Sequence, residues 1–330
     1  MNRRQASQVT ITAAEVLAPV PAVAMTSRRY QVVVAGVDGS APSVTAARWA
    51  AEEAHLRGQR LQLVHAYQVS RLGFAGSDYR SDLDALLRCQ GSALLARTAD
   101  KLRRWIPGLD VATTLERADP RRSLVLASDH AGLTVLGCHG QEHRHLGSVA
   151  WHVWAHALSP VAVIPQDTGH PDGPVLLGVD GSAGCHAAMG YAFDEAHARG
   201  ADLFALHARD DPAVQGLGRR PLLDAAEDRG EHAALAEQLA GWQQKYPAVI
   251  VRQYVVWGRP GPALLWYAQT APLHPQMIVI GGHGRGGLAG FLPGSTGHTL
   301  LGHTLLGHTL LGHADCPVVV VRPLESATAN

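Results

Sequence analysis

The 330-residue sequence has few cysteines, no net charge and no long apolar run, and each absence excludes a class of protein. The four cysteines are scattered and form no C-x-x-C pair, which favours a reducing compartment over a disulfide framework. Twenty-eight basic side chains balance 28 acidic ones, which argues against a nucleic-acid-binding tract or a basic membrane-binding surface. No run approaches the roughly 18 consecutive apolar residues of a membrane-spanning helix. We therefore expect a cytoplasmic protein that binds neither nucleic acid nor a membrane.

The N-terminal stretch 1–28 imitates a secretory leader, with arginines at the start and a later Ala-Val-Ala. Glu15, Pro19 and Pro21 interrupt its apolar part, so it has no sustained helical core. We expect a disordered extension, and either Met1 or Met25 as the true start of the protein.

The chain contains an internal repeat at a fixed offset of 142 positions. VVVAGVDGS (32–40) recurs as VLLGVDGS (175–182), EAHLRG (53–58) as EAHARG (195–200), and LVHA (63–66) as ALHA (205–208). Three matches at one offset indicate two copies of one domain. The predicted organisation is a first domain (29–166), a linker rich in Pro and Gly (167–173), a second domain (174–323) and a short tail (324–330).

Each copy alternates short apolar runs with longer helical patterns. In the second copy we expect helices at Cys185–Ala198, Leu222–Tyr246 and Pro262–Gln269, with apolar strands between them. Strands that are apolar throughout indicate an α/β fold in which helices cover both faces of a parallel sheet. Ligands bind such sheets beyond the carboxyl ends of the strands, so the residues that follow each strand are the candidates for a site.

A glycine-rich loop, GGHGRGGLAGFLPGST (281–296), follows the fourth strand of the second copy. Glycines let successive backbone N–H groups point inward and form a nest for phosphate oxygens. Ser295 opens a helix whose N-terminus favours an anion, and Arg285 adds the loop's one fixed positive charge. Asp180, after the neighbouring strand, could accept a hydrogen bond from an adenine amino group or a ribose hydroxyl. The pattern predicts a nucleotide site, although glycine-rich turns can also serve only as tight corners.

These residues resemble the universal stress protein family, whose nucleotide motif is G-x-x-G, nine residues, then G-S/T. Gly281 to Gly284, nine residues, and Gly294-Ser295 match it in full. The family's V-D-G-S turn recurs at Asp38 and at Asp180, and its G-x-P turn at Gly258. The resemblance implies two tandem flavodoxin-like (Rossmann-like) domains, each with a mostly parallel five-stranded sheet. It also implies ATP as ligand, with or without Mg²⁺, and pairing through the last strand.

The second copy supplies the stronger candidate site. Its predicted nucleotide-binding residues are Asp180, Gly181, Ser182, Gly258, Gly281, Gly284, Arg285, Gly294, Ser295 and Thr296. In the first copy only six residues separate Gly140 from Gly147, and Gln141 replaces the arginine, which removes a charge-assisted contact. The weaker set there is Asp38, Gly137, Gly140, Gly147 and Ser148.

The segment GHTLLGHTLLGHTLLGH (297–313) repeats a five-residue unit that contains histidine. On a helix a five-residue step rotates by about 140°, so these histidines scatter around the axis and we predict no metal site. Gly147 to Pro160 spans 13 positions and Gly294 to Pro317 spans 23, a difference of two repeat units. We interpret the repeat (298–312) as an expansion within an existing helix.

The leading functional hypothesis is a regulatory stress-response module that binds ATP. The alternatives are a slow ATPase or phosphotransfer enzyme, and a scaffold that acts by protein–protein pairing without nucleotide. Residues 281–296 contain no acidic side chain that could bridge a metal to phosphate, which argues against rapid phosphoryl transfer. The apolar last strands VAVI (161–164) and VVVV (318–321) are expected to pair the two domains, and a homodimer through them is a further possibility.

Overall fold

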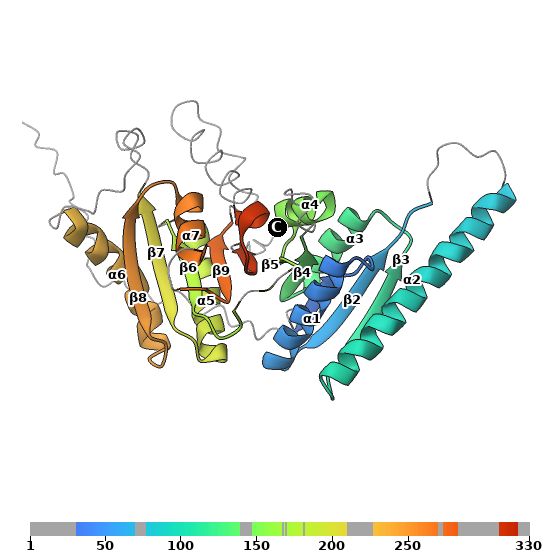
Figure 1. Ribbon diagram of the computed structural model, residues 1–330, viewed down its shortest axis with the longest axis horizontal. Coiled ribbons are helices and arrows are strands. Elements are labelled where there is room, and N and C mark those ends of the chain that lie inside the picture. Colours follow the sequence, from blue (N-terminus) through green and yellow to red (C-terminus); the bar gives the residue numbers. More distant parts are fainter. Residues whose placement is uncertain are drawn as a thin grey trace, which may run out of the picture.

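The chain forms one ten-stranded sheet with helices on both faces (Figure 1). The computed structural model describes residues 31–69, 77–138, 147–166, 168, 170–180, 182–209, 227–269, 273–282 and 310–322. The strand order is β3-β2-β1-β4-β5-β10-β9-β6-β7-β8, so the first five strands in the chain form one half of the sheet and the last five form the other. The predicted tandem α/β architecture is confirmed.

In the first half, strands and helices alternate as the apolar runs predict. The elements are β1 (Val32–Gly36), α1 (Ala41–Leu56), β2 (Arg60–Ala66), α2 (Ser77–Trp105), β3 (Val111–Glu116), α3 (Pro120–Ala127), β4 (Leu133–Gly137), α4 (Ser148–His156) and β5 (Val161–Ile164). All strand pairs within this half are parallel. The carboxyl ends of β1 and β4, which pair directly, therefore lie at the same edge of the sheet.

The second half repeats the pattern. Its elements are β6 (Val175–Val179), α5 (Ala183–Arg199), β7 (Leu203–Arg209), α6 (Glu227–Lys245), β8 (Val251–Trp257), α7 (Pro260–Gln269), β9 (Met277–Gly281) and β10 (Val318–Val321). The predicted helices match α5 and α7 to within two residues at each end. The predicted helix Leu222–Tyr246 corresponds to α6, and its first residues fall in 210–226, outside the described residues.

Serine caps start the first helix of each half. The Ser40 hydroxyl accepts from the Ser43 N–H, and the Ser182 hydroxyl accepts from the Cys185 N–H, which satisfies one of the free amides at each helix start. At the other end of α5, Gly200 adopts a left-handed conformation with φ 62°, as a glycine cap requires. None of the helices within the described ranges is long and apolar enough to cross a membrane.

The two halves join through their last strands. β10 pairs with β5 in antiparallel register, with Val319 opposite Ala162, and it pairs with β9 in parallel on its other side. β5 likewise has β4 on its far side. Both last strands therefore lie inside the sheet, where apolar residues on both faces are buried.

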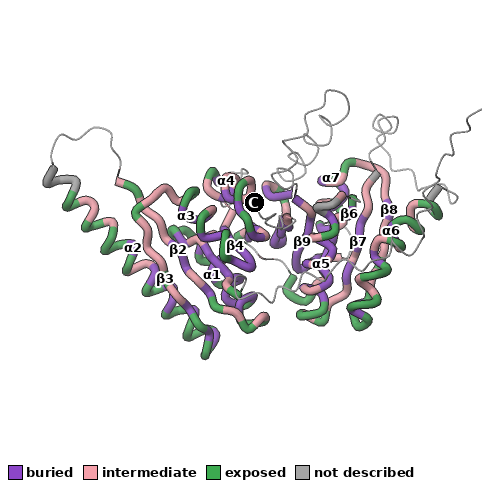
Figure 2. Tube along the Cα trace, turned by 180° about the vertical axis from the view of Figure 1, so that it is seen from behind, coloured by how far each residue is buried: buried purple, intermediate pink, exposed green. Residues whose placement is uncertain are grey.

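Two apolar layers flank the sheet, and Figure 2 shows buried residues along the central strands and on the helix surfaces that face them. One layer packs α1, α2, α5 and α6 against the sheet, and the other packs α3, α4, α7 and the short helical stretch 310–313. Each layer includes residues from both halves, so the core continues across the junction.

The repeated EAHLRG and EAHARG segments meet across that junction. Glu53 and Glu195 are fully buried, and each carboxylate contacts both Arg57 and Arg199. The Arg199 Nε to Glu195 distance is 3.0 Å, and the arginine side chains are only 14% and 20% exposed. We call these four residues the charge quartet. Its members are related by the same offset of 142, so the repeat builds a nearly symmetric contact between α1 and α5.

The short helical stretch 310–313, at the end of the HTLLG repeat, corresponds in the second half to the C-terminal part of α4 in the first half. Leu310 and Val153 each lie seven positions before the proline that precedes the last strand, Pro317 and Pro160, and both are fully buried. Their carbonyls accept the N–H groups of Ala314 and Ala157, both at 2.8 Å. The earlier units of the repeat lie outside the described residues. Among the residues that are described, no cluster of three or more His, Cys, Asp or Glu is arranged to hold a metal ion.

Candidate nucleotide-binding site

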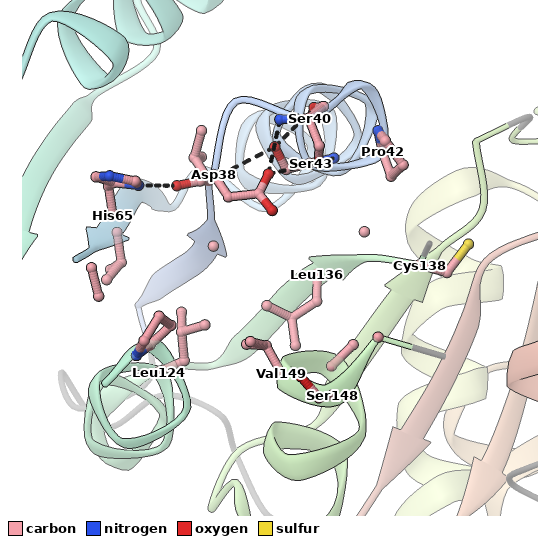
Figure 3. Close-up of a pocket in the computed structure, with 18 residues that line it drawn as sticks. Asp38, Ser40, Pro42, Ser43, His65, Leu124, Leu136, Cys138, Ser148 and Val149 are labelled. Atoms are coloured by element: carbon pink, nitrogen blue, oxygen red, sulfur yellow. Dashed lines mark hydrogen bonds between the residues drawn. The ribbon is translucent and has the colours of Figure 1, made fainter. Parts of the chain in front are cut away.

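A pocket of about 180 Å³ opens at the carboxyl ends of β1 and β4 in the first half (Figure 3). Four of the residues predicted for the weaker site line it: Asp38, Gly137, Gly147 and Ser148. The fifth, Gly140, lies outside the described residues. The repeat motif and the fold therefore bring these positions together, although 110 positions of sequence separate Asp38 from Ser148.

Asp38 lies at the pocket mouth and is held by the turn that starts α1. Its carboxylate accepts the Ser40 N–H at 2.9 Å and the Ser40 hydroxyl at 2.6 Å. Partial burial acts to raise the pKa of Asp38, but hydrogen bonds with Ser40 and Ser43 and within the turn together outweigh it and lower that pKa. The carboxylate is therefore ionised at neutral pH and available as an acceptor for a ligand hydroxyl or amino group.

Gly137 is required by a close approach of two backbones. A Cβ atom at this position would lie 2.5 Å from the carbonyl carbon and oxygen of Pro42 and 2.8 Å from the Ser43 nitrogen. These are main-chain atoms at the start of α1, so they cannot rotate away. The glycine lets the end of β4 lie directly against the helix start.

The N-terminus of α4 forms another wall. Gly147 is the N-cap residue, and it makes no side-chain capping bond to the first turn of α4. Gly147, Ser148, Val149 and Ala150 all line the pocket. The first amides of a helix have no partner within the helix and carry partial positive charge, so this wall suits an anion.

The apolar part of the pocket was missed by sequence reasoning. Leu124 comes from α3, Leu136 from β4 and Val149 from α4. The motif identifies only strand ends and glycines, and these side chains reach the pocket from three separate elements. Cys138, which also lines it, follows Gly137 and was available to sequence reasoning as the second residue of Gly-Cys-His-Gly.

His65 lines the same pocket, and its sequence signal was the repeat that pairs it with His207. The Nδ1 atom of His65 lies 2.7 Å from the Val37 carbonyl, and Nδ1 of His207 lies 2.8 Å from the Val179 carbonyl. Each histidine thus joins the end of the second strand of its half to the end of the first. His65 therefore both contacts a main-chain carbonyl and lines the pocket wall.

In the second half the structure describes four of the predicted residues. The Asp180 carboxylate accepts the Ser182 N–H at 2.9 Å, as Asp38 does with Ser40. Gly258 has φ 134°, a conformation that favours glycine, and Gly281 ends β9 as Gly137 ends β4. The other predicted residues lie outside the described ranges: Gly181, Gly284, Arg285, Gly294, Ser295 and Thr296.

Comparison with known proteins decides the family. The model of the universal stress protein family matches residues 29–165 and 173–322. The chain belongs to the universal stress protein family. Universal stress proteins of Mycobacterium bovis and Mycobacterium tuberculosis are 37% identical to it over 307 residues, which cover 89% of this chain and 98% of theirs. One from Mycolicibacterium smegmatis is 35% identical over 306 residues, covering 88% and 97%.

A solved structure supports the tandem fold of this universal stress protein. A universal stress protein from Archaeoglobus fulgidus superposes with a TM-score of 0.62 and covers 88% of this chain and 98% of its own. At 15% sequence identity, this likeness supports the fold alone.

Proposed function

We propose that this universal stress protein binds ATP, with or without Mg²⁺, and acts as a regulatory stress-response module. The nucleotide binds chiefly in the second half, whose motif from Gly281 to Ser295 is complete, and more weakly in the pocket of the first half. The observation that supports this most directly is the pocket itself. It gathers Asp38, Gly137 and Ser148, which the motif selects from the sequence, around one cavity.

The walls of the pocket match the parts of a nucleotide. Leu124, Leu136 and Val149 offer an apolar surface for a base, and Asp38 can accept a hydrogen bond from a ribose hydroxyl or an amino group. The first amides of α4 suit an anionic group. At about 180 Å³ the cavity is smaller than the roughly 300–1,000 Å³ of typical ligand pockets, so we assign the weaker binding to this half.

The charges around the pocket favour binding over phosphoryl transfer. Rapid transfer requires carboxylates that hold a bridging metal and a residue that positions the nucleophile. Among the described residues that line the pocket, Asp38 is the single carboxylate, and none is a lysine or arginine. The loop 281–296 of the second half has no acidic residue either. Any turnover of ATP should therefore be slow.

Calorimetric titration of ATP into the full chain tests the proposal, with Asp180→Ala and Asp38→Ala as a matched pair. Each variant removes the same acceptor from one half. Asp180→Ala should abolish the tighter binding or weaken it by about tenfold or more, and Asp38→Ala should do the same to the weaker binding. Asp110→Ala is the control, because this exposed aspartate pairs with Arg60 before β3, at the opposite end of the sheet.

Three other results would contradict the proposal. Undiminished ATP binding in both Asp180→Ala and Gly284→Val would refute the assigned site in the second half. No ATP binding by the parent chain would favour the scaffold hypothesis. A steady-state ATPase rate of about one per second or more, which is within the range of kinases, would favour an enzyme.

A further inference from the structure

The C-terminal end of α4 is held by a residue from the other half of the chain. In a continuing helix the Leu158 N–H would donate to the Trp154 carbonyl, but it donates instead to the Ser128 hydroxyl at 2.9 Å. The Trp154 carbonyl accepts from the Arg322 guanidinium. The same guanidinium donates to the Ala157 carbonyl at 2.7 Å. A cation at this end also interacts favourably with the helix dipole.

Arg322 is itself fixed at the edge of the second half. It directly follows β10, which pairs with β5 of the first half. The Gly282 N–H donates to the Val321 carbonyl at 2.7 Å. A Cβ on Gly282 would lie 2.9 Å from Cγ1 of Val320 and 3.0 Å from Cγ of Arg322, so the arginine stem packs closely against this glycine. The guanidinium therefore projects from a packed stem toward α4.

The other end of α4 lines the first-half pocket. The helix has nine residues from Ser148 to His156, so a shift at its C-terminal turn also moves its N-terminal amides. We infer that Arg322 is a positioning residue for the first-half nucleotide pocket, whose α4 wall is therefore held in place by the second half. It acts by holding the last carbonyls of α4, so that the amides of Ser148 to Ala150 keep their place at the pocket wall. This inference depends on the proposed nucleotide binding in that pocket.

The test uses Arg322→Met and Arg322→Lys in the full chain that also carries Asp180→Ala, so that ATP binding reports on the first half. Methionine keeps the stem against Gly282 but removes all donors, and we expect it to weaken ATP binding about tenfold. Lysine keeps one donor group and should recover part of the affinity. Hydrogen exchange should become faster in the amides of α4 in the methionine variant, without added nucleotide.

Arg103→Met is the matched control. Arg103 also donates to a main-chain carbonyl, that of Val111 at 2.7 Å, but it lies on α2 away from α4. It should leave ATP binding unchanged. In the full chain that carries Asp38→Ala, ATP binding reports on the second half, and there Arg322→Met should leave the affinity for ATP unchanged.

The outcomes separate the two proposals. If the Asp180→Ala chain binds no ATP, nucleotide binding by the first half is refuted, and the role of Arg322 with it. If that chain binds ATP and Arg322→Met binds equally well, only the positioning role is overturned. An equal loss of affinity in both halves would also overturn it, because it would indicate a general structural effect.

Discussion

The charge quartet makes a quantitative prediction about stability. Glu195→Gln keeps the size of a fully buried side chain but removes its charge, which leaves Arg57 and Arg199 facing Glu53 alone. Removing one partner of a buried ion pair typically costs about 3–5 kcal/mol, because the remaining charge stays desolvated without compensation. We expect a loss of this size in the free energy of unfolding at pH 7, measured by urea denaturation.

An exposed pair provides the comparison. Arg48 and Glu52 lie 3.4 Å apart on α1 with side chains about half exposed, so Glu52→Gln should cost no more than about 0.5 kcal/mol. If Glu195→Gln costs less than about 1 kcal/mol, or no more than Glu52→Gln, the contact of the charge quartet between α1 and α5 does not stabilise the fold.

The dependence of this loss on pH has a definite sign. Burial acts to raise the pKa of Glu195, but Arg57 and Arg199 outweigh it and hold that pKa at about 2, below the usual 4.5. Burial and repulsion by Glu195 raise the pKa of Glu53, so Glu53 takes up the first proton. The stabilisation from ionised Glu195 is complete above pH 4.5 and is lost as the pH falls toward 2. The difference between the parent and Glu195→Gln should therefore shrink below pH 4.5.

Three further predictions concern glycines and a cysteine. Gly137→Ala should destabilise the chain by about 1–3 kcal/mol, because the added Cβ meets the backbone of Pro42, and urea denaturation would measure the loss. Gly241→Ala should instead stabilise it by about 0.4–1 kcal/mol in the same assay, because this glycine lies within α6 and nothing lies within 4 Å of the added Cβ. Saturating ATP should slow alkylation of Cys138, which lines the pocket, as followed by mass spectrometry.

The alkylation assay has an internal control. Cys89 is exposed on α2, and ATP should leave its alkylation unchanged. Burial raises the pKa of Cys138, so alkylation of Cys138 should accelerate as the pH rises and more thiolate forms. Equal alkylation rates for Cys138 with and without ATP would count against nucleotide in that pocket. A stabilising Gly137→Ala would show that the end of β4 does not approach α1 so closely.

The local features of the fold could be predicted because each depends on nearby residues. Apolar runs predict the positions of the strands. Serine N-caps mark the first residues of α1 and α5, and Gly200 marks the end of α5. The polar half of the pocket followed from the same logic, because residues after parallel strands meet at one edge of the sheet. The strand-end argument selected Asp180, and the motifs of the resembled family then selected Asp38 and Gly137 at the equivalent strand ends of the first half.

The rest depends on contacts between distant elements. In the sequence, Leu124 and Leu136 look like ordinary core residues. Only the fold brings them together at the pocket, Leu124 from α3 and Leu136 from β4. The EAHLRG repeat was visible, but its role was not, because Glu53 meets Arg199 only through the pairing of β5 with β10. The role of Arg322 could not be predicted from the sequence, because its partners are main-chain carbonyls 165 and 168 positions away.

The position of β5 and β10 in the middle of the sheet limits how two chains could associate. Each of these strands already has a neighbour on both sides, so a second chain cannot simply add to them. A dimer through these strands would require the chains to exchange halves, with the 167–173 linker crossing between them. In such a swapped pair, Arg322 of one chain would hold α4 of the other, and the α4 wall of each first-half pocket would depend on the partner molecule.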